Sequence, residues 1–166
     1  MEEIIYRPIG VIHSSHSKPE ETPIQPIFAE GCRGTAEIFP EYGEGLMDLE
    51  GFSHIYLLFY FHQAENCRLK VKPYLEDVEH GVFATRAPCR PNRIGISIVR
   101  LLSRSDNILE LDDLDIIDGT PLIDIKPYCA KFDCIATLSN GWQDYLIDHE
   151  TVAILGRRNY RREEEK

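Results

Sequence analysis

Apolar residues along the chain fall into short runs that glycine, proline and polar residues separate. Runs of about 4–8 residues between such breaks are typical of β-strands rather than long helices. We therefore predict strands at residues 6–12, 33–39, 53–61, 68–74, 81–85, 94–102, 108–111, 114–117 and 122–125.

Two of these segments indicate how their faces are buried. Residues 33–39 alternate, with Thr35 and Glu37 polar and Ala36 and Ile38 apolar, which predicts a strand with one buried face. Residues 55–61 are apolar throughout, which predicts a strand covered on both faces.

The remaining segments predict loops, turns and a little helix. Residues 13–25 are polar and contain two prolines, so they form a long loop; residues 40–45 form a turn, and residues 46–49 one helical turn. Residues 141–149 carry Trp142, Tyr145 and Leu146 at helical spacing, which predicts a short amphipathic helix. The expected fold is a single, mostly β domain: a small non-Rossmann β-barrel at residues 1–156, with long loops, a short C-terminal helix and a frayed charged tail at 157–166.

Composition narrows the function classes. The 166 residues carry a net charge of −10, which excludes a uniformly basic nucleic-acid binder but leaves room for a local basic face. The longest apolar run is far shorter than the ~20 residues of a membrane span, and the Met1-Glu2-Glu3 start is not that of a signal peptide. Five cysteines without C-x-x-C spacing indicate reduced thiols in a cytoplasmic protein, with no metal site expected.

No nucleotide-binding fingerprint is present. The chain has neither G-x-G-x-x-G after a strand nor a P-loop, and its one G-x-G lies in the turn at 40–45. A nucleotide-like cofactor would therefore bind without a Rossmann unit.

The densest group of chemically active residues lies at 81–97. It places Arg86, Arg90, Asn92 and Arg93 on a loop that prolines 88 and 91 restrain. Guanidinium groups on a pre-ordered loop suit a carboxylate or a phosphate. The alternative is a rigid connector whose arginines face water.

A second group surrounds the Asp118-Gly-Thr-Pro turn. Asp115, Asp118, Asp124, Lys126 and Tyr128 lie on or beside two short apolar segments. A plain tight turn is the alternative interpretation. The pair His62-Gln63 ends the apolar strand, where polar residues line a pocket or simply leave the core.

These blocks together resemble the TsaA-like family of TrmO-type tRNA methyltransferases. The resemblance covers about residues 5–128. It is carried by Pro8-Ile9-Gly10, Pro23-Ile24-Gln25, Gly51-Phe52-Ser53-His54, Phe61-His62-Gln63, Gly81-Val82-Phe83-Ala84-Thr85-Arg86, Arg90-Pro91-Asn92, Ile94-Gly95, Ser97, Asp118-Gly119-Thr120-Pro121 and Asp124-Ile125-Lys126-Pro127-Tyr128.

The resemblance implies a homodimeric β-barrel that binds S-adenosylmethionine and methylates N6 of threonylcarbamoyladenosine, the purine 3′ of the tRNA anticodon. It implies cofactor contacts at Pro23, Ile24, Gln25, His62, Gln63, Arg86, Ile96, Leu114, Asp115 and Ile116. Ile24 stands where the family usually has Arg, and Arg93 where it usually has Pro. Longer members carry a C-terminal extension that helps hold tRNA, whereas this sequence ends at Lys166.

The chemistry of such a transfer predicts residue roles. The N6 lone pair is delocalised, so a general base must take its proton, and Asp118 is the first candidate with Tyr128 the second. The threonyl carboxylate needs a cation, which Arg90 or Lys126 supplies.

Repulsion of tRNA by the acidic surplus requires that cations gather on one face. Besides the 86–93 loop, the candidates are Arg68, Lys70, Lys72, Arg157, Arg158, Arg161 and Arg162. Two other functions remain open: methylation of another small or RNA substrate, and a non-enzymic module that binds an adenosine-like ligand.

Overall fold

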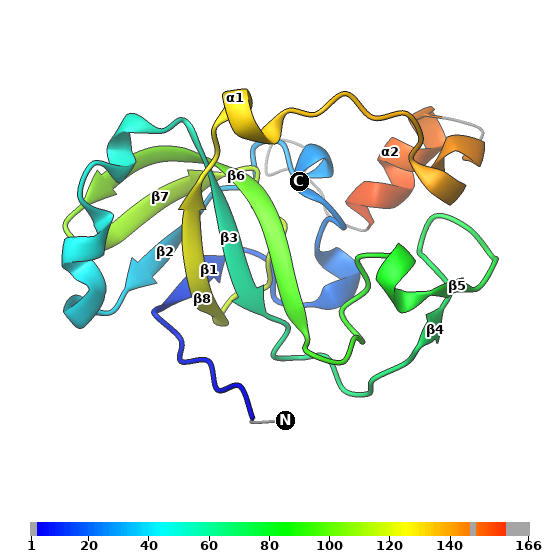
Figure 1. Ribbon diagram of the computed structural model, residues 1–166, viewed down its shortest axis with the longest axis horizontal. Helices are drawn as coiled ribbons and strands as arrows, with labels where there is room; N and C mark the ends of the chain where they lie inside the picture. The colour runs from blue at the N-terminus through cyan, green and yellow to red at the C-terminus, as the bar shows by residue number, and fades with distance from the viewer. Residues whose placement is uncertain (1–2, 147–148, 159–166) are drawn as a thin grey trace.

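A closed six-stranded antiparallel β-barrel forms the centre of the computed structural model, which describes residues 3–146 and 149–158 (Figure 1). Its strands are β1 (Gly10–Ser14), β2 (Gly34–Ile38), β3 (His54–Tyr60), β6 (Ile94–Ser105), β7 (Ile108–Asp112) and β8 (Thr120–Pro127). They close in the order β1-β2-β7-β6-β3-β8. The expected mostly β, non-Rossmann barrel is confirmed.

Short elements decorate the barrel. A two-stranded ribbon pairs β4 (Lys70–Val71) with β5 (His80–Gly81), and two α-helices follow the last strand, α1 (Ala130–Asp133) and α2 (His149–Arg157). The 3₁₀ helices are η1 (Pro19–Glu21), η2 (Pro26–Phe28), η3 (Pro40–Leu46), η4 (Leu49–Gly51), η5 (Val82–Ala84) and η6 (Gly141–Tyr145). No helix in the described part of the chain is long and apolar enough to span a membrane.

The barrel interior is filled by the inward-facing residues of the alternating strands. Fully buried side chains from the strands meet there: Ile12, Ala36, Ile55, Leu57, Val99, Leu109, Leu111 and Leu122. Gly95 faces the same interior, where a Cβ would lie only 2.3 Å from the Phe59 ring. The phenyl ring therefore occupies the space that a side chain at 95 would need.

Three long connections leave one end of the barrel, which we call the loop end. Strand register brings Ser14 opposite Gly34, Ile12 opposite Thr120 and Tyr60 opposite Ile94. The three connections begin or end beside these pairs and comprise residues 15–33, 61–93 and 113–119. Segments distant in sequence are thus gathered at one end of the fold.

The β3 strand corrects one prediction. Its inward residues Ile55, Leu57 and Phe59 are buried, but Tyr56 and Leu58 are only half-buried and Tyr60 is 37% exposed. The prediction that both faces of this strand are covered was therefore wrong. In the part of the chain that the structure describes, no second layer packs on the outer face of the barrel here.

Several predicted elements are shorter than expected or have another conformation. Within the predicted strands 68–74 and 81–85, only β4 and Gly81 pair as strands, because residues 82–84 form the 3₁₀ helix η5. The first strand, predicted from residue 6, begins only at Gly10. Residues 114–117 form no strand; they cross the loop end with Leu114 and Ile116 buried. Residues 40–46 form η3, and 49–51 rather than 46–49 form the next helical turn.

The C-terminal prediction is also changed in detail. Within 141–149, residues 141–145 form the helical turn η6, residues 147–148 lie outside the described residues, and His149 begins α2. The longer helix α2 follows and ends at Arg157, where the charged tail was expected to begin. Arg161, Arg162 and the rest of 159–166 lie outside the described residues, and the boundary at 156 stays a prediction.

Candidate functional site

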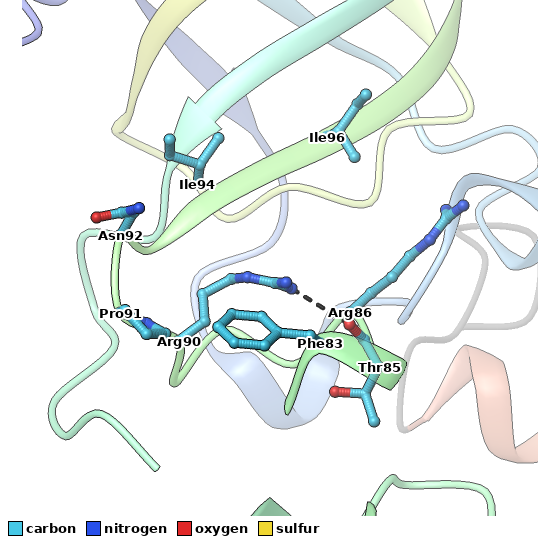
Figure 2. A pocket seen from close by; sticks show the side chains of 8 residues that line it. All are labelled: Phe83, Thr85, Arg86, Arg90, Pro91, Asn92, Ile94 and Ile96. Carbon is cyan, nitrogen blue, oxygen red and sulfur yellow. Dashed lines mark hydrogen bonds between the residues drawn. The ribbon is translucent and has the colours of Figure 1, made fainter. Parts of the chain in front are cut away.

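A pocket of about 390 Å³ lies between the outer face of β6 and the loop that follows η5 (Figure 2). The loop is short and rich in proline, so its backbone is restrained where it passes the strand. The pocket is lined by Phe83, Thr85, Arg86, Arg90, Pro91, Asn92, Ile94 and Ile96.

The lining combines an apolar wall with basic and amide groups. Ile96 is 47% exposed and Phe83 76% exposed, so both offer apolar surface to a ligand. The Arg90 guanidinium donates a 3.3 Å hydrogen bond to the Thr85 carbonyl. All eight lining residues are neutral or basic, which suits a ligand with a flat apolar body and an anionic group.

Arg86 joins this pocket to the first long loop. Its Nη1 donates a hydrogen bond to Oε1 of Gln25, a residue 61 positions earlier in the chain. Gln25 in turn donates from Nε2 to the Ile24 carbonyl at 2.5 Å, and Pro23 is buried beside them. The structure thus brings together two of the predicted cofactor segments.

Asp115 interacts with the charge of Arg86 but lies on the inner side of β6, opposite to the face that lines the pocket. Ser97 Oγ, which faces the barrel interior, donates a 2.6 Å hydrogen bond to Asp115 Oδ1. Burial raises the pKa of Asp115 to about 7, against the opposing effects of the Ser97 hydrogen bond and the Arg86 charge. A carboxyl that titrates in this range can exchange a proton with a substrate near neutral pH.

The backbone of residues 114–116 is fixed by the segment that follows β1. Ser14 Oγ donates to the Ile116 carbonyl at 2.6 Å, and His16 Nε2 lies 2.9 Å from the Leu114 carbonyl. Desolvation lowers the pKa of His16 and favours its neutral ring, whose Nε2–H can donate to that carbonyl. Asp115 is therefore presented from a rigid backbone.

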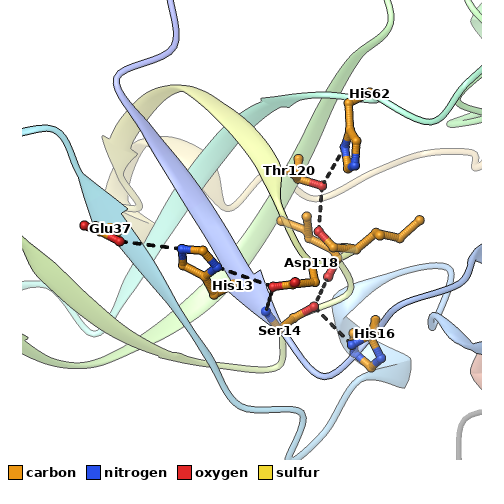
Figure 3. A network of polar contacts seen from close by, with 9 residues as sticks. His13, Ser14, His16, Glu37, His62, Asp118 and Thr120 are labelled. Atoms are coloured by element: carbon orange, nitrogen blue, oxygen red, sulfur yellow. Dashed lines mark hydrogen bonds and ion pairs between the residues drawn. The ribbon is translucent and has the colours of Figure 1, made fainter.

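His62 and Gln63 lie beside the same loop end. His62 Nδ1 is 3.2 Å from Thr120 Oγ1, which donates to the Ile117 carbonyl at 2.6 Å (Figure 3). Gln63 is exposed. His62 thus contacts Thr120, whose hydroxyl also binds the backbone of the crossing segment at Ile117.

Asp118 lies elsewhere. Its Oδ1 accepts a 3.1 Å hydrogen bond from the Ser14 backbone N–H and lies 3.4 Å from His13 Nδ1, whose other ring nitrogen is 3.6 Å from Glu37 (Figure 3). This places the carboxylate over β1, with β8 and β3 between it and the β6 pocket. Within one chain, Asp118 is not beside Arg90.

Lys126 and Tyr128 are also separated from the pocket. Lys126 lies opposite Tyr56 on the outer face and pairs with Asp124 at 2.8 Å. The Tyr128 N–H donates to the His54 carbonyl, at the end of β3 away from Ile94. Seven residues of β3 correspond to about 20 Å, so the four predicted catalytic residues do not meet in one chain.

Arg93 has a structural place in the described chain. It has a positive φ of 47° and donates from Nη2 to the Glu65 carbonyl at 2.6 Å. Its guanidinium therefore ties together the two ends of the 61–93 loop, rather than facing the pocket that Arg90 lines.

Sequence reasoning gave no role to Ser97 or to Thr120. Each is a buried hydroxyl residue, with 2–3% of its surface exposed, in a strand otherwise rich in apolar residues. A hydroxyl residue in an apolar strand could have indicated a functional position in the sequence, since a buried hydroxyl must find a hydrogen-bond partner.

Comparisons with known proteins agree with this architecture. The sequence profile of the tRNA-methyltransferase O N-terminal domain matches residues 11–134. A protein of Pyrococcus abyssi, named as a probable S-adenosyl-L-methionine-binding protein, is 55% identical over 84% of this chain and 76% of its own length.

Two further relatives carry more specific names. The human tRNA (adenine(37)-N6)-methyltransferase is 39% identical over 88% of this chain, which corresponds to only 35% of the human protein. The crystal structure of TrmO from Pseudomonas aeruginosa superposes with a TM-score of 0.72 at 41% identity, covering 85% of this chain and 63% of that one. The chain therefore spans about a third to two thirds of these two proteins.

Proposed function

The chain belongs to the family of tRNA-methyltransferase O N-terminal domains, and from that premise we propose that it is an S-adenosylmethionine-dependent methyltransferase acting on tRNA. The proposed target is N6 of threonylcarbamoyladenosine beside the anticodon. The observation that carries the proposal is the convergence of Gln25, Arg86 and Asp115 beside a basic, apolar-walled pocket. Relatives named as binding the cofactor and as modifying adenine 37 support both halves of it.

The residues present fit the cofactor. A sulfonium ligand carries apolar, cationic and carboxylate parts, and the cluster offers Ile96, the Asp115 carboxyl and the Arg86 guanidinium. Pro23, Gln25 and the backbone of 114–116 would hold the adenosine from the neighbouring loops. When bound, the cofactor supplies an electrophilic methyl group, and the chain must orient the acceptor against it.

Arg90 is placed to bind the anionic end of the substrate. It lines the pocket and has no acidic neighbour among the lining residues, so its charge is available to a threonyl carboxylate. The apolar wall of Ile94, Ile96 and Phe83 would accept the purine.

Asp115 is the better placed of the two aspartates to hold the proton that N6 releases. The charge of Arg86, which lines the pocket, acts on Asp115, and the pKa of about 7 suits a proton acceptor, whereas Asp118 is held over β1 by Ser14 and His13. Asp118 remains a candidate base only if a second subunit brings a substrate to it.

We also propose that the working unit is a homodimer. The outer face of β3 and β6 exposes Tyr60, Ile96 and Ile98, and residues 132–138 add Phe132 and Leu138. Exposed apolar side chains on one element pair can mark an interface, and two-fold pairing is the commonest form of homo-oligomer. The partner's Tyr128 and Lys126 would then approach a pocket that they cannot reach within one chain.

The experiment incubates unmodified and threonylcarbamoylated tRNA with the protein and cofactor, and measures nucleosides by mass spectrometry. A mass gain of one methyl group only on the threonylcarbamoyl nucleoside supports the proposal; calorimetry should show about micromolar cofactor binding. Absence of any methylated nucleoside, with cofactor binding retained, would favour a non-enzymic binding module. That module is kept as the second candidate because the P. abyssi relative is named only for cofactor binding.

A further inference from the structure

The last described part of the chain, residues 141–146 and 149–158, returns to the loop end and contacts both loops of the candidate site (Figure 1). We call these residues the C-terminal clamp. They follow the part that the family profile matches, which ends at residue 134. Nothing in the proposed reaction gives them a role, so their contacts need an explanation of their own.

Trp142 fixes the loop that carries Arg86. Its Nε1 donates a 2.9 Å hydrogen bond to the Ala84 carbonyl, two residues before Arg86. The indole also stacks on the His80 ring, with centroids 4.8 Å apart and an interplanar angle of 19°. One side chain thereby contacts both β5, through His80, and the last residue of η5, Ala84.

Helix α2 fixes the loop that carries Gln25. The Gly156 carbonyl accepts a 2.8 Å hydrogen bond from the Ile24 N–H, next to Gln25. Gly156 also packs directly against Phe28, since a Cβ at 156 would lie 2.4 Å from the ring. The absence of a side chain at 156 lets the helix approach η2 this closely.

Arg158 connects the two loops to each other. Its Nη1 donates to the Pro19 carbonyl in the first loop, and its guanidinium carbon lies 4.6 Å from the centre of the Tyr74 ring in the second. Its Nε is buried without a hydrogen-bond partner among the described residues, which offsets part of the stabilisation that these contacts contribute. Arg158 therefore contacts both loops at once, with its Nε–H left unsatisfied among the described residues.

We propose that Trp142, Gly156 and Arg158 are positioning residues that hold Gln25 and Arg86 at hydrogen-bond distance and so pre-organise the cofactor site. The inference rests on the proposed function in naming that site. Loops that are ordered before binding lose less conformational entropy on binding, so removing the clamp should weaken affinity. The barrel core, formed by residues 12–122, does not include the clamp and should keep its stability.

The test compares Arg158→Ala, Arg158→Lys and Gly156→Ala with Arg33→Ala, an exposed arginine in the first loop, as the matched control. S-adenosylmethionine affinity is measured by calorimetry, and thermal stability by scanning calorimetry. Arg158→Ala and Gly156→Ala should weaken binding about tenfold with the barrel transition little changed. Arg158→Lys should recover most of the affinity, because an ammonium can keep both the carbonyl and the ring contact.

Gly156→Ala separates positioning from helix stability. Alanine favours a helix over glycine by about 1 kcal/mol, so a purely structural role predicts a more stable protein with unchanged affinity. Adding Phe28→Leu, which makes room for the new methyl group, should restore affinity. Unchanged affinity in Arg158→Ala, or a weakening of affinity that only follows the fall in thermal stability, would overturn the proposal.

Hydrogen exchange of the ligand-free protein keeps this test apart from the function itself. Arg158→Ala should raise exchange in residues 22–28 and 82–90 together, and Arg33→Ala should not. If the parent protein binds no cofactor, the proposed function fails, while this exchange result still decides whether the clamp orders the two loops.

Discussion

Ser97 and Asp115 are joined by a 2.6 Å hydrogen bond at the loop end of the barrel. The Ser97 hydroxyl points into the barrel and donates to the Asp115 carboxyl, which lies on the segment that crosses this end. The bond links the wall of the barrel to the segment that carries a predicted cofactor contact. It also places an acidic group in a site whose burial disfavours the charged form.

This burial makes the stability of the ligand-free protein depend on pH. The folded-state pKa of Asp115 is about 7, above the ordinary value of 3.8, so the folded chain binds the proton more tightly than the unfolded chain. The contribution of Asp115 to the free energy of unfolding is greatest below its ordinary pKa and is lost as the pH rises toward 7. Asp115→Asn should therefore gain stability relative to the parent as pH rises from about 4 to about 8, measured by denaturant unfolding. A constant difference across that range would contradict the assignment.

Gln25 and Arg86 should act as one unit in cofactor binding. Gln25→Ala and Arg86→Ala each break the same inter-loop hydrogen bond, so the double variant should lose less affinity than the two single variants do in sum. A coupling of about 1–2 kcal/mol is expected for residues in contact. Calorimetric titration of the four proteins completes the cycle, and additive effects would show that the two loops act independently.

Mixing two inactive variants tests the homodimer. Arg90→Ala and Tyr128→Phe should each abolish turnover, and if each site combines Arg90 from one subunit with Tyr128 from the other, mixed dimers regain one intact site. Activity after subunit exchange should then rise to about a quarter of the parent value, since half of randomly formed dimers are mixed and each has one of two sites. No recovery, with light scattering showing that mixed dimers form, would mean that the two residues do not share a site across subunits.

Arg68 and Lys70 are the best candidates for binding tRNA phosphates. Both are exposed, whereas Lys72 pairs with Asp77 at 3.3 Å and Arg93 is bound to Glu65. Arg68→Glu with Lys70→Glu should raise KM for tRNA and leave cofactor affinity unchanged. The log–log slope of tRNA affinity against salt should become shallower by about 0.7–0.9 for each phosphate that the protein no longer neutralises.

A control for charge reversal elsewhere is Arg7→Glu, at an exposed arginine before β1, which reverses one charge where the pair reverses two. It changes the net charge without altering Arg68 or Lys70, so it should leave KM for tRNA near the parent value. An activity insensitive to salt would point to a smaller substrate.

Gly95 tests the packing of the barrel. Gly95→Ala places a methyl group against the Phe59 ring and should destabilise the protein by about 1–3 kcal/mol. Gly45→Ala, where nothing lies within 4 Å of the new atom, should be neutral or slightly stabilising. Unfolding curves of the two variants measure the difference.

The sequence by itself determined the local conformation of most of the barrel. Alternation in residues 33–39 placed Ala36 and Ile38 on the buried face, because side chains of a strand point to opposite sides in turn. The motifs resembling the TsaA-like family also selected Gln25 and Arg86, which the structure joins. Such information is local, and neighbouring residues are sufficient to carry it.

Only the tertiary structure decided which distant residues meet. Closure of the barrel puts β8 beside β1, so the Asp118 carboxylate binds Ser14, 104 positions away in the chain. Asp118 therefore lies away from the pocket, although the sequence motif suggested that it belonged to the active site. The same closure brings Ser97 under Asp115 and leaves the outer face of β3 open, although its apolar run resembles a fully covered strand. Strand order and register set these distances, and both depend on packing across the whole barrel, which no single segment encodes.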